Sequence, residues 1–185
     1  MKKLTLSALL AASACAPFAV HAADGTINIT GSVISASCVP SAGGNPTTTV
    51  NLDPAPANEL VVSGATAAKR KTFNISVSNC LSGTAKAYFE STNANVDATT
   101  GNLKNTATAG AATNVQVAIY RGDTKLDLSK TNAVQDTTAG VALTSDGAAT
   151  PKYSGDLTYS AGYAATGMAT GGTVSTSITY VIDNS

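Results

Sequence analysis

Residue types that carry most protein chemistry are scarce in this sequence. Its 185 residues include one histidine, His21, and three cysteines, Cys15, Cys38 and Cys80. General-base and nucleophilic catalysis usually depend on an imidazole or an activated thiolate, and zinc sites need several of these side chains together. Whether even these four residues remain in the working protein depends on the N-terminal segment.

Residues 1–22 have the pattern of a cleaved export signal. Lys2 and Lys3 precede a mostly apolar stretch, and the segment ends in Val-His-Ala, which fits a small-x-small cleavage site. The apolar stretch is too short and too rich in alanine and serine for a transmembrane helix. An alternative cut at Cys15 resembles lipoprotein processing, but the leucine usual three residues earlier is absent.

Cleavage after Ala22 removes His21 and Cys15, and leaves 163 residues (185 minus 22). The remaining Cys38 and Cys80 predict one disulfide, because the compartment beyond the inner membrane is oxidising. Two unpaired buried thiols are the alternative. A cross-link over 42 residues (80 minus 38) stabilises a fold by about 4 kcal/mol in the chain-entropy model.

The other polar residues indicate no catalytic, cofactor or metal site. Acidic residues are scattered singly, without the spacing of a calcium loop, and no serine lies in a nucleophile elbow. Loss of two lysines with the signal leaves 9 basic residues (11 minus 2) against 11 acidic ones. That balance offers no basic surplus for nucleic acid or a membrane surface. We therefore expect the protein not to be an enzyme.

Strand patterns separated by turn signals recur along the chain, as in an all-β sandwich. A polar, turn-rich stretch at 92–113 predicts an exposed loop. The charge run 69–71 favours a solvated strand edge, with a binding role as the alternative. The predicted strands are residues 23–33, 47–52, 73–77, 84–91, 114–120, 141–143, 156–164 and 173–182, and the connector 57–71 includes a short strand at 60–62.

The opening strand pattern, directly after the signal, raises a question about its partner. Ile27, Ile29, Gly31 and Val33 share one phase of the alternation, and polar residues share the other. Such a terminal strand is either the first strand of its own sheet or a segment intended for another chain.

Several of these stretches, in this order, resemble the major pilin subunits of chaperone–usher fimbriae, the type 1 and P pilus class. The matching sequences are GTINITGSVISASC at 25–38, FNISVSNC at 73–80, NVQVAIY at 114–120, YSAGY at 159–163 and the ending GTVSTSITYVI at 172–182. The resemblance covers nearly the whole mature chain.

The resemblance implies an incomplete immunoglobulin-like β-sandwich that is completed by a donor strand from a neighbouring subunit. On this interpretation residues 1–22 are the signal, 23–31 are the N-terminal donor-strand extension, and 32–185 form the pilin domain. The donor residues that face the neighbour's groove would be Gly25, Ile27, Ile29 and Gly31.

The resemblance also implies the partners: identical or homologous pilin subunits, a periplasmic chaperone and an outer-membrane usher. The chaperone would contact the C-terminal strand through Ile178, Tyr180 and Ile182, at the edge of the groove. One departure is Asn184, since the family usually has tyrosine at the penultimate position. The protein would pass through the periplasm to an extracellular fimbria on a Gram-negative cell, where a host receptor would be contacted only by a separate tip adhesin.

The function implied is therefore a structural subunit that polymerises by donor-strand exchange and supports adhesion. Two other interpretations remain open from the sequence. One is a minor adaptor subunit of the same pilus. The other is a secreted or lipid-anchored β-sandwich that binds a ligand as lectins do, which would be a self-complete monomer.

Overall fold

We analysed a computed structural model, which describes residues 38–40 and 47–184. These residues belong to the compact unit Ile34–Ser185. The predicted signal at 1–22, the donor extension at 23–31 and the opening strand pattern at 23–33 lie outside the described residues. No helix within the described ranges has the length and apolar character needed to cross a bilayer.

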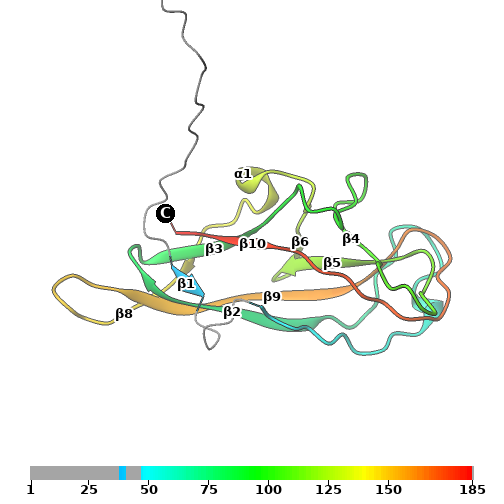
Figure 1. Cartoon of the computed structure of the whole chain (residues 1–185), viewed down its shortest axis with the longest axis horizontal. Coiled ribbons are helices and arrows are strands. Elements are labelled where there is room, and N and C mark those ends of the chain that lie inside the picture. Colours follow the sequence, from blue (N-terminus) through cyan, green and yellow to red (C-terminus); the bar gives the residue numbers. More distant parts are fainter. Residues whose placement is uncertain (1–37, 41–46, 185) are drawn as a thin grey trace, which may run out of the picture. The chain divides into compact units, whose positions relative to one another are not determined.

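The described residues form a β-sandwich of two sheets, with little helix (Figure 1). The prediction of an all-β fold is therefore confirmed. The elements in chain order are β1 (Val39–Pro40), η1 (Ala57–Glu59), β2 (Lys71–Cys80), β3 (Thr84–Phe89), β4 (Leu103–Lys104), β5 (Val115–Arg121), β6 (Thr124–Lys125), α1 (Asn132–Gln135), β7 (Val141–Ala142), β8 (Thr144–Ser145), β9 (Tyr153–Ala165) and β10 (Tyr180–Asp183).

The larger sheet is built around the long strand β9, which pairs antiparallel with β2 on one side and with β5 on the other. The order is β1-β2-β9-β5-β4, with β6 on β5 and β8 on β9. Alternation sets the register, because Ile75 opposite Leu157 turns two apolar side chains to the same buried face. The predicted strands 73–77, 114–120 and 156–164 all lie in this sheet.

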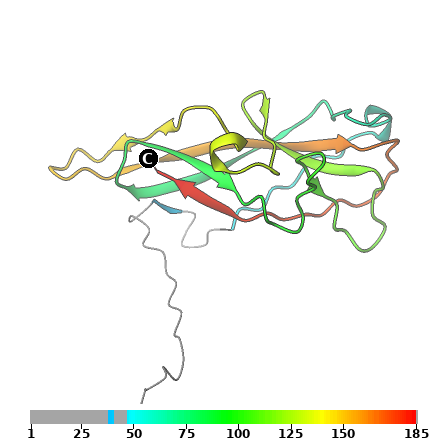
Figure 2. The same cartoon turned by 90° about the horizontal axis from the view of Figure 1, so that it is seen from above.

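The smaller sheet has the order β10-β3-β7 and packs over the larger one (Figures 1 and 2). In β3 the alanines at 85 and 87 and Phe89 are buried, and the residues between them are more exposed. The ring of Phe89 meets Tyr159 of the larger sheet edge-on, with ring centres 5.3 Å apart. The core therefore lies between the two sheets.

The predicted disulfide joins Cys38 to Cys80, with their Cα atoms 4.1 Å apart. Cys38 immediately precedes β1 and Cys80 ends β2, so the bond ties the first described strand to its neighbour in the sheet. Both cysteines are buried. The structure thus confirms the pairing expected from an exported chain with two cysteines.

Two loop predictions differ from the structure. The short strand at 60–62 is wrong: η1 ends at Glu59 and the chain turns, leaving Leu60 buried but the following valines exposed. The stretch 92–113 is not simply an exposed loop, because Val96 and Leu103 reach the core and β4 lies within it. There Asp97 accepts hydrogen bonds from the backbone N–H groups of residues 99 and 100, a local turn that polar composition alone does not reveal.

All three residues of the charge run 69–71 are exposed, as predicted, and two of them also have partners. The Arg70 guanidinium lies 3.9 Å from the centre of the Tyr120 ring, and Lys71 Nζ is 3.5 Å from a carboxylate oxygen of Asp53. These contacts hold the beginning of β2 against β5 and the chain before η1. The run therefore has structural partners.

Candidate functional site: a groove with an unpaired strand edge

An open groove of about 930 Å³ runs along the sandwich between residues 47–52 and residues 174–182. Its floor is made of core side chains from both sheets, and its walls are the two extended segments. The apolar floor residues are Phe73, Ile75, Phe89, Leu103, Val117, Ile119, Ala161 and Tyr163. A groove of this kind leaves a strip of the hydrophobic core uncovered within the described part of the chain.

One wall is the segment 174–182, which ends in β10. All residues from 174 to 180 line the groove, but burial alternates as strand geometry requires, and the more buried residues are Val174, Thr176, Ile178, Tyr180 and Ile182. The residues between them, such as Ser175 and Ser177, are exposed. The three C-terminal residues singled out in the sequence, Ile178, Tyr180 and Ile182, thus belong to this wall.

The backbone of residues 174–179 is hydrogen-bonded to other described residues on one side. Thr106 N–H donates to the Ser175 carbonyl (2.7 Å) and Glu90 N–H donates to the Thr179 carbonyl (3.0 Å), both away from the groove. The alternate residues Val174, Thr176 and Ile178 make no backbone hydrogen bond with any described residue. Because backbone groups of an extended chain point alternately to its two sides, theirs face the groove.

The side chain of Thr176 adds one more unsatisfied group to this wall. Its buried Oγ1 has no hydrogen-bond partner among the described residues. Buried polar groups without partners are rare in complete folds. Among the described residues, Val174, Thr176 and Ile178 therefore present an unpaired strand edge to the groove.

The opposite wall, residues 47–52, was predicted as a strand and is extended but has no strand pairing with described residues. Val50 and Leu52 are half-buried and pack on the core. This wall runs from the end near Cys38 toward the end near Val174, whereas 174–182 runs the other way. A strand laid in the groove would be antiparallel to one wall and parallel to the other.

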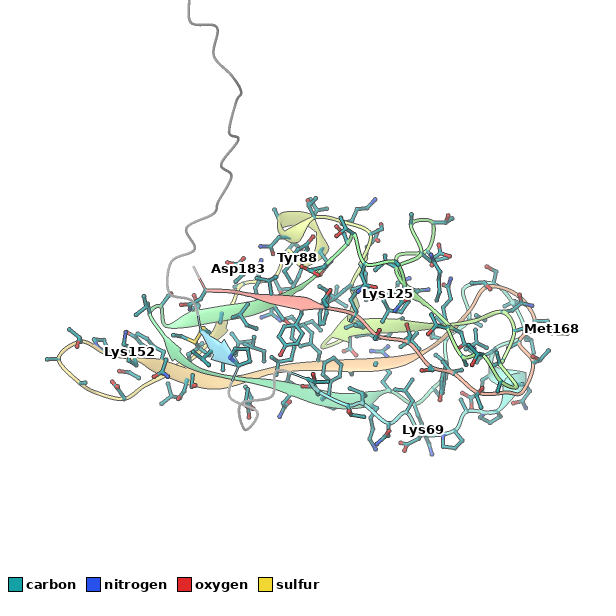
Figure 3. All side chains as sticks on the ribbon, in the orientation of Figure 1. Lys69, Tyr88, Lys125, Lys152, Met168 and Asp183 are labelled. Carbon is teal, nitrogen blue, oxygen red and sulfur yellow. A yellow bond between two sulfur atoms is a disulfide. The ribbon has the colours of Figure 1, made fainter. Side chains whose placement is uncertain are left out.

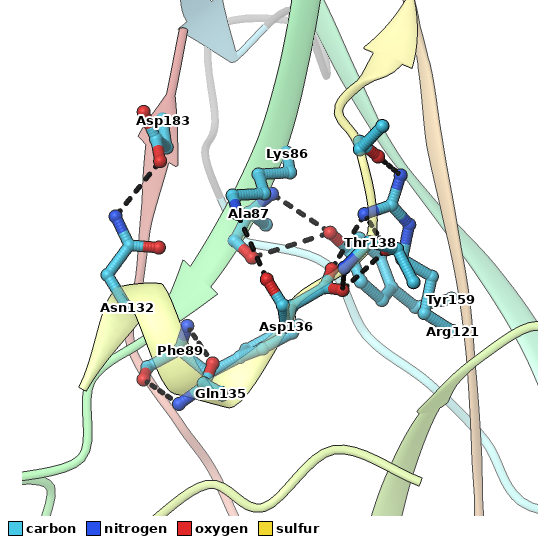
Figure 4. Close-up of polar contacts among 11 residues, drawn as sticks. Lys86, Ala87, Phe89, Arg121, Asn132, Gln135, Asp136, Thr138, Tyr159 and Asp183 are labelled. Atoms are coloured by element: carbon cyan, nitrogen blue, oxygen red, sulfur yellow. Dashed lines mark hydrogen bonds and ion pairs between the residues drawn. The ribbon is translucent and has the colours of Figure 1, made fainter. Parts of the chain in front are cut away.

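The outer edge of β3, in contrast, is closed. Ala85 pairs with Val141 of β7, and Ala87 N–H donates to the Tyr159 hydroxyl at 2.9 Å. The carboxamide of Gln135 in α1 accepts from Phe89 N–H (2.9 Å) and donates to the Phe89 carbonyl (2.8 Å), as Figure 4 shows. Among the described residues, the edge of β3 away from β10 is therefore already covered by β7 and Gln135.

A buried ion pair supports this closed edge. Arg121 Nη1 lies 2.7 Å from an Asp136 carboxylate oxygen, and Asp136 is 4% exposed (Figure 4). Burial acts to raise the pKa of Asp136, but hydrogen bonds from Thr138 and Arg121 outweigh it and hold the pKa below its usual range. Burial raises the pKa of Tyr159, which keeps the hydroxyl protonated. Arg121, Asp136 and Tyr159 do not line the groove, although the Tyr159 ring packs beneath its floor residues Phe73 and Phe89.

Within the described ranges, no three His, Cys, Asp or Glu side chains come together as metal ligands. The groove itself offers apolar surface and backbone hydrogen-bonding groups. Neither Val174 nor Thr176 was singled out from the sequence, although the alternation in TVSTSITYVI places both in phase with Ile178. Nor was it predicted that Gln135 covers the outer edge of β3. The predicted donor residues Gly25, Ile27, Ile29 and Gly31 lie outside the described residues.

The sequence matches the family model described as fimbrial protein over residues 27–183. It is 37% identical to the major fimbrial subunit SMF-1 of Stenotrophomonas maltophilia (strain K279a) over 172 residues, covering 91% of this chain and 97% of that protein. It is 36% identical to the F17 fimbrial protein of Escherichia coli over 184 residues, covering 96% of this chain and 94% of that one. The chain belongs to the fimbrial protein family.

A solved structure agrees with this fimbrial fold. A chain in a chaperone–usher pilus structure superposes with a TM-score of 0.53 at 17% identity, covering 88% of this chain and 96% of that one. The fimbrial protein is thus a structural subunit of an extracellular fimbria on Gram-negative cells, where fimbriae serve adhesion. The resemblance expected from the sequence is confirmed.

Proposed function

We propose that this subunit polymerises by donor-strand exchange, with residues 23–31 of one copy lying in the groove of the next. The observation that supports this most is the unpaired edge of Val174, Thr176 and Ile178 over an open stretch of core. An added strand would receive main-chain hydrogen bonds from that edge and insert alternate side chains into the groove.

The donor segment has the required pattern. Gly25, Ile27, Ile29 and Gly31 share one phase, and a seven-residue strand from 25 to 31 is about 20 Å long at 3.3 Å per residue. Burial of the two isoleucines contributes about 3–6 kcal/mol, before the hydrogen bonds are counted. The polar phase, which includes Thr26 and Asn28, would face solvent.

The donor strand is expected to run antiparallel to residues 174–182. That wall is held in a sheet through β10 and β3, and antiparallel pairing is the more stable arrangement per residue. The same free edge explains the other partners proposed here. A periplasmic chaperone would cover the groove through Ile178, Tyr180 and Ile182 until an outer-membrane usher brings the next subunit.

We infer that the subunit has a structural role in the fimbrial shaft and no catalytic one. The relatives that it covers almost end to end include a major fimbrial subunit, which favours the shaft over a minor adaptor. A self-complete lectin-like monomer is disfavoured by the open groove.

The test is to place a charge in each phase of the donor segment. Ile27→Asp with Ile29→Asp puts carboxylates where the groove is apolar, and should abolish the multimers that resist SDS without boiling. The matched variant Thr26→Asp with Asn28→Asp charges the other phase of the same segment and should assemble normally. If both variants form multimers alike, residues 23–31 are not the donor strand.

A further inference from the structure

The end of the sandwich beyond Val174 exposes three large apolar side chains. Val61 is 45% exposed, Val62 62% and Met168 71%. Figure 3 shows Met168 at the end of the molecule opposite to Lys152 and Asp183. Val61 and Val62 come from the loop after η1, and Met168 comes from the loop after β9. We call these three residues the distal patch. The sequence pattern did not predict that the two loops share a surface.

Hydrogen bonds between the two loops bring the patch together. Gly64 N–H donates to the Ala165 carbonyl (2.8 Å), and Ala169 N–H donates to the Leu60 carbonyl (2.9 Å). The two bonds hold the turn at 61–64 against the bend at 166–168, so Val61, Val62 and Met168 belong to neighbouring loops. The backbone thus holds three exposed apolar residues in one place, and clustered exposure of this kind marks interaction surfaces.

The other end of the sandwich exposes a second, smaller apolar pair. Val39 is 52% exposed and Leu81 is 49% exposed. Each follows directly on a disulfide cysteine, and the Cα atoms of Cys38 and Cys80 are 4.1 Å apart. Val39 and Leu81, called here the disulfide-end pair, thus lie in the region around the disulfide, where the antiparallel register places Val39 opposite Ser78 of β2.

The proposed strand exchange determines which of these ends meet. A donor strand antiparallel to 174–182 leaves the groove beside Val174, which packs against Leu60 and Ala169 at the base of the distal patch. From donor residue 31 to Cys38 is seven residues (38 minus 31), at most about 25 Å of chain. The donor subunit's disulfide end is thereby kept next to the acceptor's distal patch.

We propose that Val61, Val62 and Met168 of each subunit pack against Val39 and Leu81 of the copy that donates its strand. This inference rests on the proposed strand exchange and adds a second contact to the same joint. The contact is head-to-tail, so it repeats along a filament without closing. It would stiffen a joint that otherwise depends on one short connection.

Photo-crosslinking tests the contact in intact fimbriae. The chain has two methionines, Met1 and Met168, and Met1 leaves with the predicted signal, so photo-methionine places a diazirine at Met168 alone. Irradiated SDS-resistant multimers should give cross-linked peptides that join Met168 to residues 38–40 or 81–84 of another copy. Cross-links only within one chain, or to other regions of the neighbour, overturn the proposal.

A matched control variant carries the photo-methionine at a different exposed position. Met168→Leu with Val134→Met moves it to α1, where Val134 is 59% exposed, and should not give these cross-links; if it does so equally, the proposal fails. Separately, Met168→Asp should shorten the half-life of the multimers in warm SDS about ten-fold, whereas Val134→Asp should not. An unchanged half-life for Met168→Asp also overturns the contact. Absence of multimers from the unaltered chain would instead contradict the strand exchange itself.

Discussion

At the scale of single residues, side-chain amides at two places in this fold make the hydrogen bonds that the backbone of a neighbouring strand would otherwise make. The Gln135 carboxamide is bonded to both backbone groups of Phe89, as a neighbouring strand would be. Asn184 Oδ1 accepts from Leu81 N–H (3.2 Å) and Ser82 N–H (3.1 Å), and its Nδ2 donates to the Ser82 carbonyl (3.1 Å). Asn184 therefore anchors the end of β10 to the turn after the disulfide.

The buried pair Arg121–Asp136 makes a pH-dependent contribution to stability. Because the pKa of Asp136 is lowered in the folded chain, unfolding raises it toward its ordinary value of 3.8. The contribution is therefore complete above about pH 4 and is lost as the pH falls further, through the folded-state pKa. Lowering the pH below about 4 should therefore reduce the stability that the Arg121–Asp136 pair contributes.

We predict that Asp136→Asn lowers the unfolding free energy near pH 7 by about 3–5 kcal/mol, because it leaves the Arg121 charge buried without its partner. It should also make the loss of stability below pH 4 shallower. Denaturant unfolding of purified fimbriae at several pH values measures both effects. The control is Asp123→Asn, which removes an exposed pairing with Arg70 and should change the free energy by less than about 1 kcal/mol.

At the scale of elements, strands buried on one face were predictable from their alternation. Residues 73–77, 114–120 and 156–164 lie in β2, β5 and β9; β2 and β9 extend beyond the predicted bounds at both ends, and β5 is shifted by one residue. Alternation reports that a face is suited to burial, but it does not report whether a partner strand exists in the same chain. This explains why 47–52 and 174–179 have strand sequences and yet no ladder on their groove sides.

Other elements were missed because their determinants are not periodic. The apolar triplet at 60–62 has strand composition, but the preceding turn of η1 leaves its valines exposed. Gln135 gave no signal at all, since its role depends on α1 lying over the edge of β3. The groove was expected only through the family resemblance, whereas its unpaired edge became visible in the hydrogen-bond pattern.

Two adjacent residues of the groove wall, Ile178 and Ser177, provide a test of the role of this segment. Ile178 faces the groove, whereas Ser177 points outward and is exposed. Ile178→Asp would bury an unpaired charge under the donor strand, at a cost of several kcal/mol, and should reduce incorporation into SDS-resistant multimers at least ten-fold. The control Ser177→Asp introduces the same carboxylate at the preceding, exposed position, and this variant should assemble normally. Immunoblots of unboiled fimbriae measure both; equal incorporation would mean that this wall does not receive the strand.

At the scale of the whole molecule, the proposed joint uses different surfaces on its two members. Each copy offers a donor segment at its N-terminus and a groove elsewhere, so growth requires both in every subunit. A copy that lacks one surface should still use the other. Chains of defined length can therefore be made from two defective variants.

Ile27→Asp/Ile29→Asp keeps its groove, and Ile178→Asp keeps its donor segment. Each alone should give no SDS-resistant multimer, but the two produced together should give a heterodimer and nothing longer. Different small epitopes inserted in the exposed turn 146–152 would distinguish the two chains on immunoblots. Multimers longer than a dimer from the mixture would show that subunits also join through surfaces other than the donor segment and the groove. The absence of a heterodimer, with both chains present in the periplasm, would mean that the segment and the groove are not each other's partners.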